Sequence, residues 1–358
     1  MFVAWRDIRF ARGRFAVIGA VVALITILVG FLTGLTAGLA AQNVSAILSL
    51  PGDQLVLGNA ADGSATFSAS ALSQTTIDQW RAAPGVRHVL PIGIVQSRAT
   101  VGKTSTGVAL FGLSRGVEST TVTDLAPLAQ GTVGVSSGAA KELHVARGGT
   151  VFILGTSYRV STVGGDAWFS HTPVVAMTPA DWARANAQMG GSGVATVLAV
   201  TGSPDWSSVA RETHTTARPP LLSLGALDTF RSEIGSLGLM VAMLLGISAM
   251  VVAAFFTVWT LQRAGDIAVM KALGATQRSL IMDALGQAFV VLVAGIGFGT
   301  IVTVGLGALA AGAVPFVVSG PTVLLPAVVM TVLGLCGAAL ALRTVTKADP
   351  LAALGSNR

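Results

Sequence analysis

Long stretches without a charged residue constrain this chain more than any other feature of its sequence. The run between Arg14 and Asp53 holds 38 uncharged residues, and the run between Glu233 and Arg263 holds 29. A third run, 284–342, holds 59. An α-helix needs ~20 apolar residues to cross the ~30 Å hydrocarbon core of a bilayer. These runs therefore predict four membrane spans, two of them within the third run.

The same runs divide the chain into membrane and water-exposed parts. The predicted parts are a cytoplasmic amphipathic arm at 1–14, spans at 15–41, 234–262, 283–311 and 322–343, an extracytoplasmic α+β domain at 42–232, a cytoplasmic loop at 263–282, an outer turn at 312–321 and a cytoplasmic tail at 344–358. The expected fold class is an α-helical membrane protein with four transmembrane helices and one α+β extracytoplasmic domain between helices 1 and 2.

Composition agrees with a membrane protein and excludes other classes. Hydrophobic residues make up 52% of the chain, charged residues 11%, and the mean hydropathy is +0.74, values far from those of a soluble domain. The net charge of +6 does not indicate nucleic-acid binding, because the basic residues are not gathered in one patch with aromatic residues. The single cysteine, Cys336, excludes a disulfide framework.

The basic residues predict the orientation. Ten of the 22 Lys and Arg lie in the arm, in the loop, in the tail or, as Arg343, at the end of the last span, whereas the outer turn has none. The positive-inside rule therefore places both termini in the cytoplasm, and we expect a multi-pass protein of a bacterial plasma membrane. A cleaved signal peptide is the competing interpretation of 15–41. An uncleaved span is favoured, because its apolar core exceeds the ~7–15 residues of a signal peptide.

The N-terminal arm alternates apolar and basic residues. Phe2, Trp5, Ile8 and Phe10 lie among arginines, a composition suited to the headgroup region of an anionic membrane. The alternative is a simple basic flank that only sets the topology of the first span.

The extracytoplasmic domain is predicted to mix strands and helices. Its short alternating or β-branched runs predict strands, and capping residues predict the helices between them. The expected strands are at 54–57, 86–101, 106–113, 150–163 and 194–201, and the expected helices at 73–83, 137–145 and 179–189.

No catalytic or metal-binding motif is found in this domain. Gly102-Lys103-Thr104 resembles the end of a phosphate-binding loop, but Ser97 stands where that loop needs a glycine. The four histidines are well separated, which favours ordinary surface or turn positions over a zinc site. No ionisable residue lies deep in a span, so a proton relay has no groups to use. We therefore expect no enzyme and no intrinsic cofactor, and energy must come from another chain.

Two spans carry side-chain patterns that predict contacts. Gly30, Gly34 and Gly38 in the first span have the spacing that lets helix backbones approach closely in lipid, within one bundle or between two copies. Met240, Met243 and Met250 in the second span share one helical face. Packing is the simpler role for these methionines, and lining the path of a flat hydrophobic ligand is the alternative.

The loop between the second and third spans contains a short capped helix. Asp266 can cap the start of a helix at 267–273, and Gly274 can end it in the left-handed conformation. Thr276 can then cap the next helix. Held between two spans, this segment must lie along the membrane surface, where it can contact a partner in the water phase.

The layout and two motifs resemble the permease subunits of the macrolide-exporter and cell-division-permease superfamily of ABC transporters. Residues 266–275, DIAVMKALGA, are similar to the family's E-I-[AG]-x-x-[KR]-A-[LI]-G-A loop, with Asp266 where Glu is more common. Residues 345–354 are similar to its closing segment. The start of the chain, 4–15, resembles the branch that contains haem-export permeases of Gram-positive bacteria and glycolipid-export permeases of cyanobacteria.

This resemblance implies a homodimer that binds two copies of a separate ATPase, which would bind the ATP and magnesium. It implies that the loop is a coupling helix, with the ATPase contacted by Asp266, Ile267, Met270, Lys271, Leu273 and Gly274. One hypothesis for the function is export of a membrane-soluble compound, with haem as the leading candidate substrate. The alternative is a signalling module whose ATPase-driven motion regulates an extracytoplasmic partner such as a cell-wall hydrolase.

Overall fold

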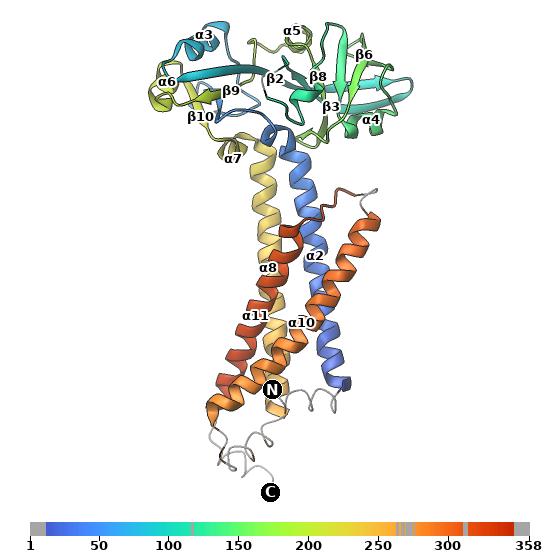
Figure 1. Cartoon of the computed structure of the whole chain (residues 1–358), viewed down its shortest axis with the longest axis vertical. Helices are drawn as coiled ribbons and strands as arrows, with labels where there is room; N and C mark the ends of the chain where they lie inside the picture. The colour runs from blue at the N-terminus through green and yellow to red at the C-terminus, as the bar shows by residue number, and fades with distance from the viewer. Residues whose placement is uncertain are drawn as a thin grey trace. The chain divides into compact units, whose positions relative to one another are not determined.

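The computed structural model describes residues 12–115, 118–262, 265, 269, 274, 276–310 and 314–346. In these ranges the chain forms four helices long and apolar enough to cross a membrane, and an α+β domain between the first and the second (Figure 1). The expected fold class is therefore confirmed. The chain divides into two compact units, Leu39–Gly235 and the remainder, which we call the extracytoplasmic domain and the membrane unit.

The long helices are α2 (Arg12–Leu48), α8 (Asp228–Gln262), α10 (Gln277–Ala310) and α11 (Gly320–Thr346). All four differ in length from the predicted spans, and two of them extend into the domain: α2 continues past residue 41, and α8 begins before residue 234. Polar residues such as Gln42 and Asn43 end an apolar run without ending a helix, because the backbone hydrogen bonds do not depend on the side chain. The ends of both helices thus belong to the extracytoplasmic domain.

One half of the extracytoplasmic domain is an antiparallel sheet in the order β10-β1-β9-β2. Its strands are β1 (Gln54–Gly58), β9 (Val197–Gly202), β10 (Thr215–Arg218) and the first part of β2 (Val86–Val101). The helices α3 (Gln74–Ala82) and α6 (Trp206–Glu212) flank this sheet. Trp80 of α3 is fully buried against the sheet, which gives this half its own apolar core.

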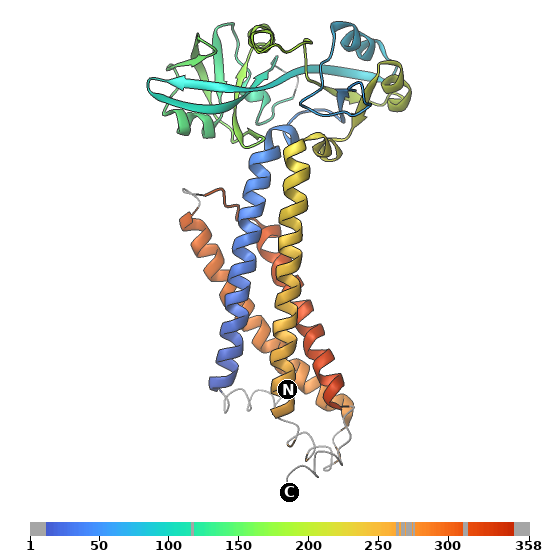
Figure 2. The same ribbon diagram turned by 180° about the vertical axis from the view of Figure 1, so that it is seen from behind.

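The other half is a closed barrel that shares β2 with the sheet. The second part of β2 pairs with β3 (Thr104–Gly112), and the pairing continues through β8 (Thr172–Met177), β4 (Thr132–Val135), β6 (Thr156–Val163) and β5 (Thr150–Ile153). A last pairing of β5 with β2 closes the ring. One long strand therefore joins both halves, as Figure 2 shows from behind.

Short elements complete the domain: η1 (Thr123–Leu125), α4 (Ser137–Leu143), β7 (Trp168–Phe169), α5 (Pro179–Gln188), α7 (Pro220–Ser223) and η2 (Leu224–Ala226). The predicted strand at 86–101 and the three predicted helices are confirmed. The predicted strand at 150–163 is wrong in one respect. It is a hairpin of β5 and β6, because Leu154 and Gly155 both take positive φ angles and reverse the chain.

Candidate coupling and substrate-facing sites

Most of the predicted coupling helix lies outside the described residues: Asp266, Ile267, Met270, Lys271 and Leu273 belong to this part. Its end is described. Gly274 has a φ of +94°, the left-handed conformation expected of a helix stop. The hydroxyl of Thr276 then accepts a hydrogen bond from the backbone N–H of Ser279 at 3.3 Å, so it caps α10 as predicted.

The three methionines of the second span lie on an exposed face of α8. Met240, Met243 and Met250 are between 56% and 67% exposed in the single chain. Ile247, between them at helical spacing, is exposed as well. This methionine face is therefore not used for packing within the described part of one chain, and it is available to lipid, a second copy or a substrate.

The glycines of the first span pack against other segments of the same chain. A side chain at Gly30 would meet Thr303 of α10, and side chains at Gly34 and Gly38 would meet Phe316 and Pro315 before α11. The backbone N–H of Val317 donates to the carbonyl of Gly34 at 3.2 Å, which holds this turn against α2. The close approach that the spacing predicts is thus made inside one chain.

The same close approach continues toward the other end of the bundle. A methyl group at Gly295 would lie 2.8 Å from the carbonyl oxygen of Gly19, and one at Gly299 would lie 2.7 Å from that of Ala23. Both glycines belong to α10, so this helix and α2 meet backbone to backbone along a glycine seam. Small residues at such positions permit the dense packing that replaces the hydrophobic effect in lipid.

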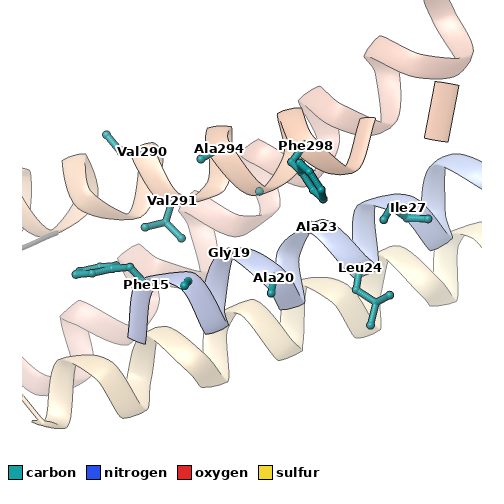
Figure 3. A pocket seen from close by; sticks show the side chains of 12 residues that line it. Phe15, Gly19, Ala20, Ala23, Leu24, Ile27, Val290, Val291, Ala294 and Phe298 are labelled. Carbon is teal, nitrogen blue, oxygen red and sulfur yellow. The ribbon is translucent and has the colours of Figure 1, made fainter. Parts of the chain in front are cut away.

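Beside the glycine seam lies an open apolar groove of about 520 Å³ between α2 and α10 (Figure 3). Phe15 and Leu24 of α2 and Phe298 of α10 are among its lining side chains. No lining residue is ionisable. The groove can therefore hold an apolar chain or ring, but it offers no group that could transfer a proton or bind a metal ion.

A polar cluster in the extracytoplasmic domain joins the ends of the two long helices. The His171 Nε2 lies 2.7 and 2.9 Å from the carboxylate oxygens of Glu233 in α8. The side-chain amide of Asn43 in α2 donates to the same carboxylate at 3.1 Å, and the hydroxyl of Thr229 donates to the Asn43 carbonyl oxygen at 3.0 Å. The Ser170 hydroxyl lies 3.2 Å from that of Thr229. We call these five residues the junction cluster.

Backbone bonds attach the junction cluster to the barrel. The N–H groups of Ser170 and His171 donate to the carbonyls of Asn43 and Gln42, both at 3.0 Å. Ser170 and His171 form the tight turn between β7 and β8, with φ angles of +46° and +62°. The turn that precedes β8 therefore contacts both the end of α2 and the start of α8.

Reasoning from sequence missed this cluster. The prediction that His171 is an ordinary surface or turn residue is right about the turn, but it named no partner for the side chain. Glu233 lies 62 residues further along the chain, so no local motif connects the two. The only available signal was position, because Asn43 and Glu233 are polar residues at the outer ends of apolar runs.

Comparison with known proteins agrees with this architecture. The family model of the FtsX-like permease C-terminal domain matches residues 238–350. A protein of Staphylococcus haemolyticus described as a putative hemin transport system permease protein, HrtB, is 25% identical over 99% of both chains. A protein of the same description from Staphylococcus epidermidis is 26% identical over 37% of this chain and 38% of its own.

Two solved structures align with about half of this chain. The periplasmic region of MacB from Actinobacillus actinomycetemcomitans aligns with a TM-score of 0.35 and 13% identity, covering 49% of this chain and 92% of that one. The extracellular domain of the ABC-type transporter YknZ from Gram-positive bacteria aligns with a TM-score of 0.31 and 12% identity, covering 46% and 98%.

The family match covers the second, third and fourth spans and the loop between them, and the full-length relative adds the first span and the domain. Residues 238–350 thus match the FtsX-like permease C-terminal domain, and over its full length the chain is similar to a protein described as a membrane permease.

Proposed function

We propose that this permease is part of an ATP-driven efflux pump that exports a hydrophobic or amphipathic compound from the membrane, with haem as the leading candidate substrate. The observation that carries the proposal is the full-length similarity to the Staphylococcus haemolyticus protein, which is described as a putative hemin transport permease. Its 99% coverage of both chains includes the four spans, the domain and the loop at 263–282.

The features of the membrane unit support a substrate that enters from the bilayer. The groove between α2 and α10 is lined without ionisable groups, and the methionine face of α8 is exposed. Thioether side chains form a polarizable surface suited to a flat aromatic ring. In this proposal Met240, Met243 and Met250 line the substrate path, and no cofactor is bound by the permease itself.

The energy would come through the loop at 263–282. In this proposal two permease copies bind two copies of the ATPase, which binds ATP and magnesium, and the contacts are made by Asp266, Ile267, Met270, Lys271, Leu273 and Gly274. Both termini would then lie in the bacterial cytoplasm with the loop. The left-handed conformation of Gly274 supports a coupling role for the loop, because it separates the residues before it from α10.

The test is haem export itself. A strain lacking the permease should become sensitive to haem, and the wild-type gene should restore resistance whereas the Gly274→Pro variant should not. Purified permease–ATPase complex should show haem-stimulated ATP hydrolysis in nanodiscs. If haem changes neither growth nor the ATPase rate, haem is not the substrate. If the variant exports normally, the coupling role of the loop is wrong.

The junction cluster favours a second candidate function. Because one turn of the barrel contacts both α2 and α8, helix motion could reshape the domain and regulate an extracytoplasmic partner such as a cell-wall hydrolase without transport. Capture of such a hydrolase by the wild-type protein, with loss of capture when 42–230 is deleted, would support this function. Export by the purified complex in the absence of any partner would count against it.

A further inference from the structure

We propose that α7 is a membrane anchor: its two leucines insert into the bilayer leaflet next to the extracytoplasmic domain and fix the domain on the membrane surface. Leu221 and Leu222 are 72% and 66% exposed, although they sit in an ordered helical turn. Two adjacent leucines exposed to this extent on a folded domain indicate a surface that is covered in the working protein.

The backbone of this segment is held rigidly by its neighbours. Ser223, Leu224 and Leu227 are each at most 5% exposed, and the two leucines among them pack in the core that also contains the end of α2. The N–H groups of Leu222 and Ser223 both donate to the carbonyl of Pro219 at 3.0 Å. The two exposed leucines therefore cannot turn inward without unfolding the segment, so their exposure is built into the fold.

The position of α7 identifies the occupant as lipid. The span-forming helix α8 begins at Asp228, a few residues after Leu222, and its uncharged run begins directly after Glu233. In both Figure 1 and Figure 2, α7 lies beside the first turns of α8, at the end of the domain where that helix starts. Leu222 is thus 11 residues before Glu233, after which the apolar run begins, and we infer that this stretch of chain reaches the headgroup layer, which adds several ångströms to each side of the hydrocarbon core.

Charge near the two leucines fits a phospholipid surface. Arg218 precedes α7 and Arg231 follows it, and both are exposed. Arginines at the headgroup level attract lipid phosphates while neighbouring apolar side chains enter the acyl boundary. Asp228 is the acidic group nearest in sequence, and it accepts a hydrogen bond from Ser68 at 3.1 Å. The anchor combines two apolar side chains with two basic ones, the composition of an interfacial segment.

The experiment uses the full chain with Cys336→Ser as background, reconstituted in nanodiscs of phosphatidylcholine and phosphatidylglycerol. A nitroxide label is attached to Leu222→Cys, to Leu221→Cys or to the matched control Ala187→Cys. Ala187 is exposed on α5, which lies at the opposite end of the domain in both views. Oxygen, which concentrates in lipid, and a water-soluble nickel chelate are used as relaxation agents.

The expected result is that the oxygen-to-nickel accessibility ratio is several-fold higher at residues 221 and 222 than at residue 187. A ratio equal to that of the control would show that the leucines face water and would overturn the proposal. Low accessibility to both agents, with spin–spin broadening that disappears on dilution with unlabelled protein, would assign the surface to a second copy instead. Low accessibility without such broadening would assign it to another protein contact, and this outcome also rejects the anchor.

Discussion

The contacts inside the membrane unit differ in kind from the contacts inside the extracytoplasmic domain. In the membrane unit α2 and α10 meet through glycines, and the hydroxyls of Thr26 and Thr303 bond to carbonyls of their own helices. In the domain, polar side chains bond across elements. The fully buried carboxylate of Asp181 in α5 accepts hydrogen bonds from the N–H of Gly131 at 3.0 Å and from the hydroxyl of Thr178 at 2.8 Å, and it also pairs with Arg184.

This difference follows from the solvent of each region and bears on function. Lipid provides no hydrophobic driving force between helices, so close backbone packing stabilises the membrane unit. Such packing has few directional bonds, and we infer that α2 and α10 can shift against each other. Directional bonds instead restrain the elements of the domain. The junction cluster is one such set of bonds, and within the domain it joins the ends of α2 and α8 to the turn before β8.

The largest effect is expected from breaking the glycine seam. Gly299→Leu would place a bulky side chain against the backbone of α2. A backbone, unlike a side chain, cannot move aside by changing its rotamer, so we expect the unfolding free energy to fall by about 3 kcal/mol. Gly297→Leu is the matched control, because nothing lies within 4 Å of that position. Thermal unfolding in nanodiscs should show a lower Tm for Gly299→Leu only. Equal melting temperatures would mean that the seam is not a stabilising contact.

A smaller effect is expected from Asp181→Ala in the domain. The substitution removes a fully buried acceptor that the N–H of Gly131 and the hydroxyl of Thr178 share, at a cost of about 2 kcal/mol. Hydrogen exchange of the full chain should show faster exchange in α5 and β4. Asp78→Ala is the control, since Asp78 and its partner Arg81 are both about half exposed and such a pair contributes roughly 0–1 kcal/mol. Unchanged exchange in Asp181→Ala would contradict the role given to the buried carboxylate.

The junction cluster should affect coupling more than stability. Glu233→Ala removes the acceptor shared by His171 and Asn43, and because this site is about one-third exposed we expect a loss of only about 1 kcal/mol. ATP hydrolysis should continue while substrate export, or activation of an extracytoplasmic partner, falls. The Glu212→Ala variant, at an exposed site on α6, serves as the control. If Glu233→Ala and Glu212→Ala function alike, the junction does not transmit motion.

The smallest effect on stability is expected at the methionine face. Met243→Ser alters an exposed side chain of α8, so the unfolding free energy should change by no more than about 0.5 kcal/mol. If the face lines the substrate path or contacts a second copy, export or dimer formation should nevertheless weaken. Chemical crosslinking and haem-stimulated ATPase rates separate these two outcomes. Wild-type values in both measurements would assign the face to lipid alone.

Much of the fold could be predicted, because hydropathy and local capping are properties of neighbouring residues. The strand at 86–101 and the left-handed conformation of Gly274 were predicted in this way. The strand β8 was not, because it is fully buried and its apolar run does not alternate. The strand β4 is short and contains Gly134, and glycine lowers strand propensity.

By itself, the sequence determined the four spans and the position of the domain, because each depends on the order of apolar and charged residues along the chain. Tertiary structure alone decided which surfaces of the spans meet. It placed the first-span glycines against Thr303, Phe316 and Pro315, and it brought His171 to Glu233. Such contacts join residues far apart in the chain, and their geometry depends on how whole elements pack, which no local pattern encodes.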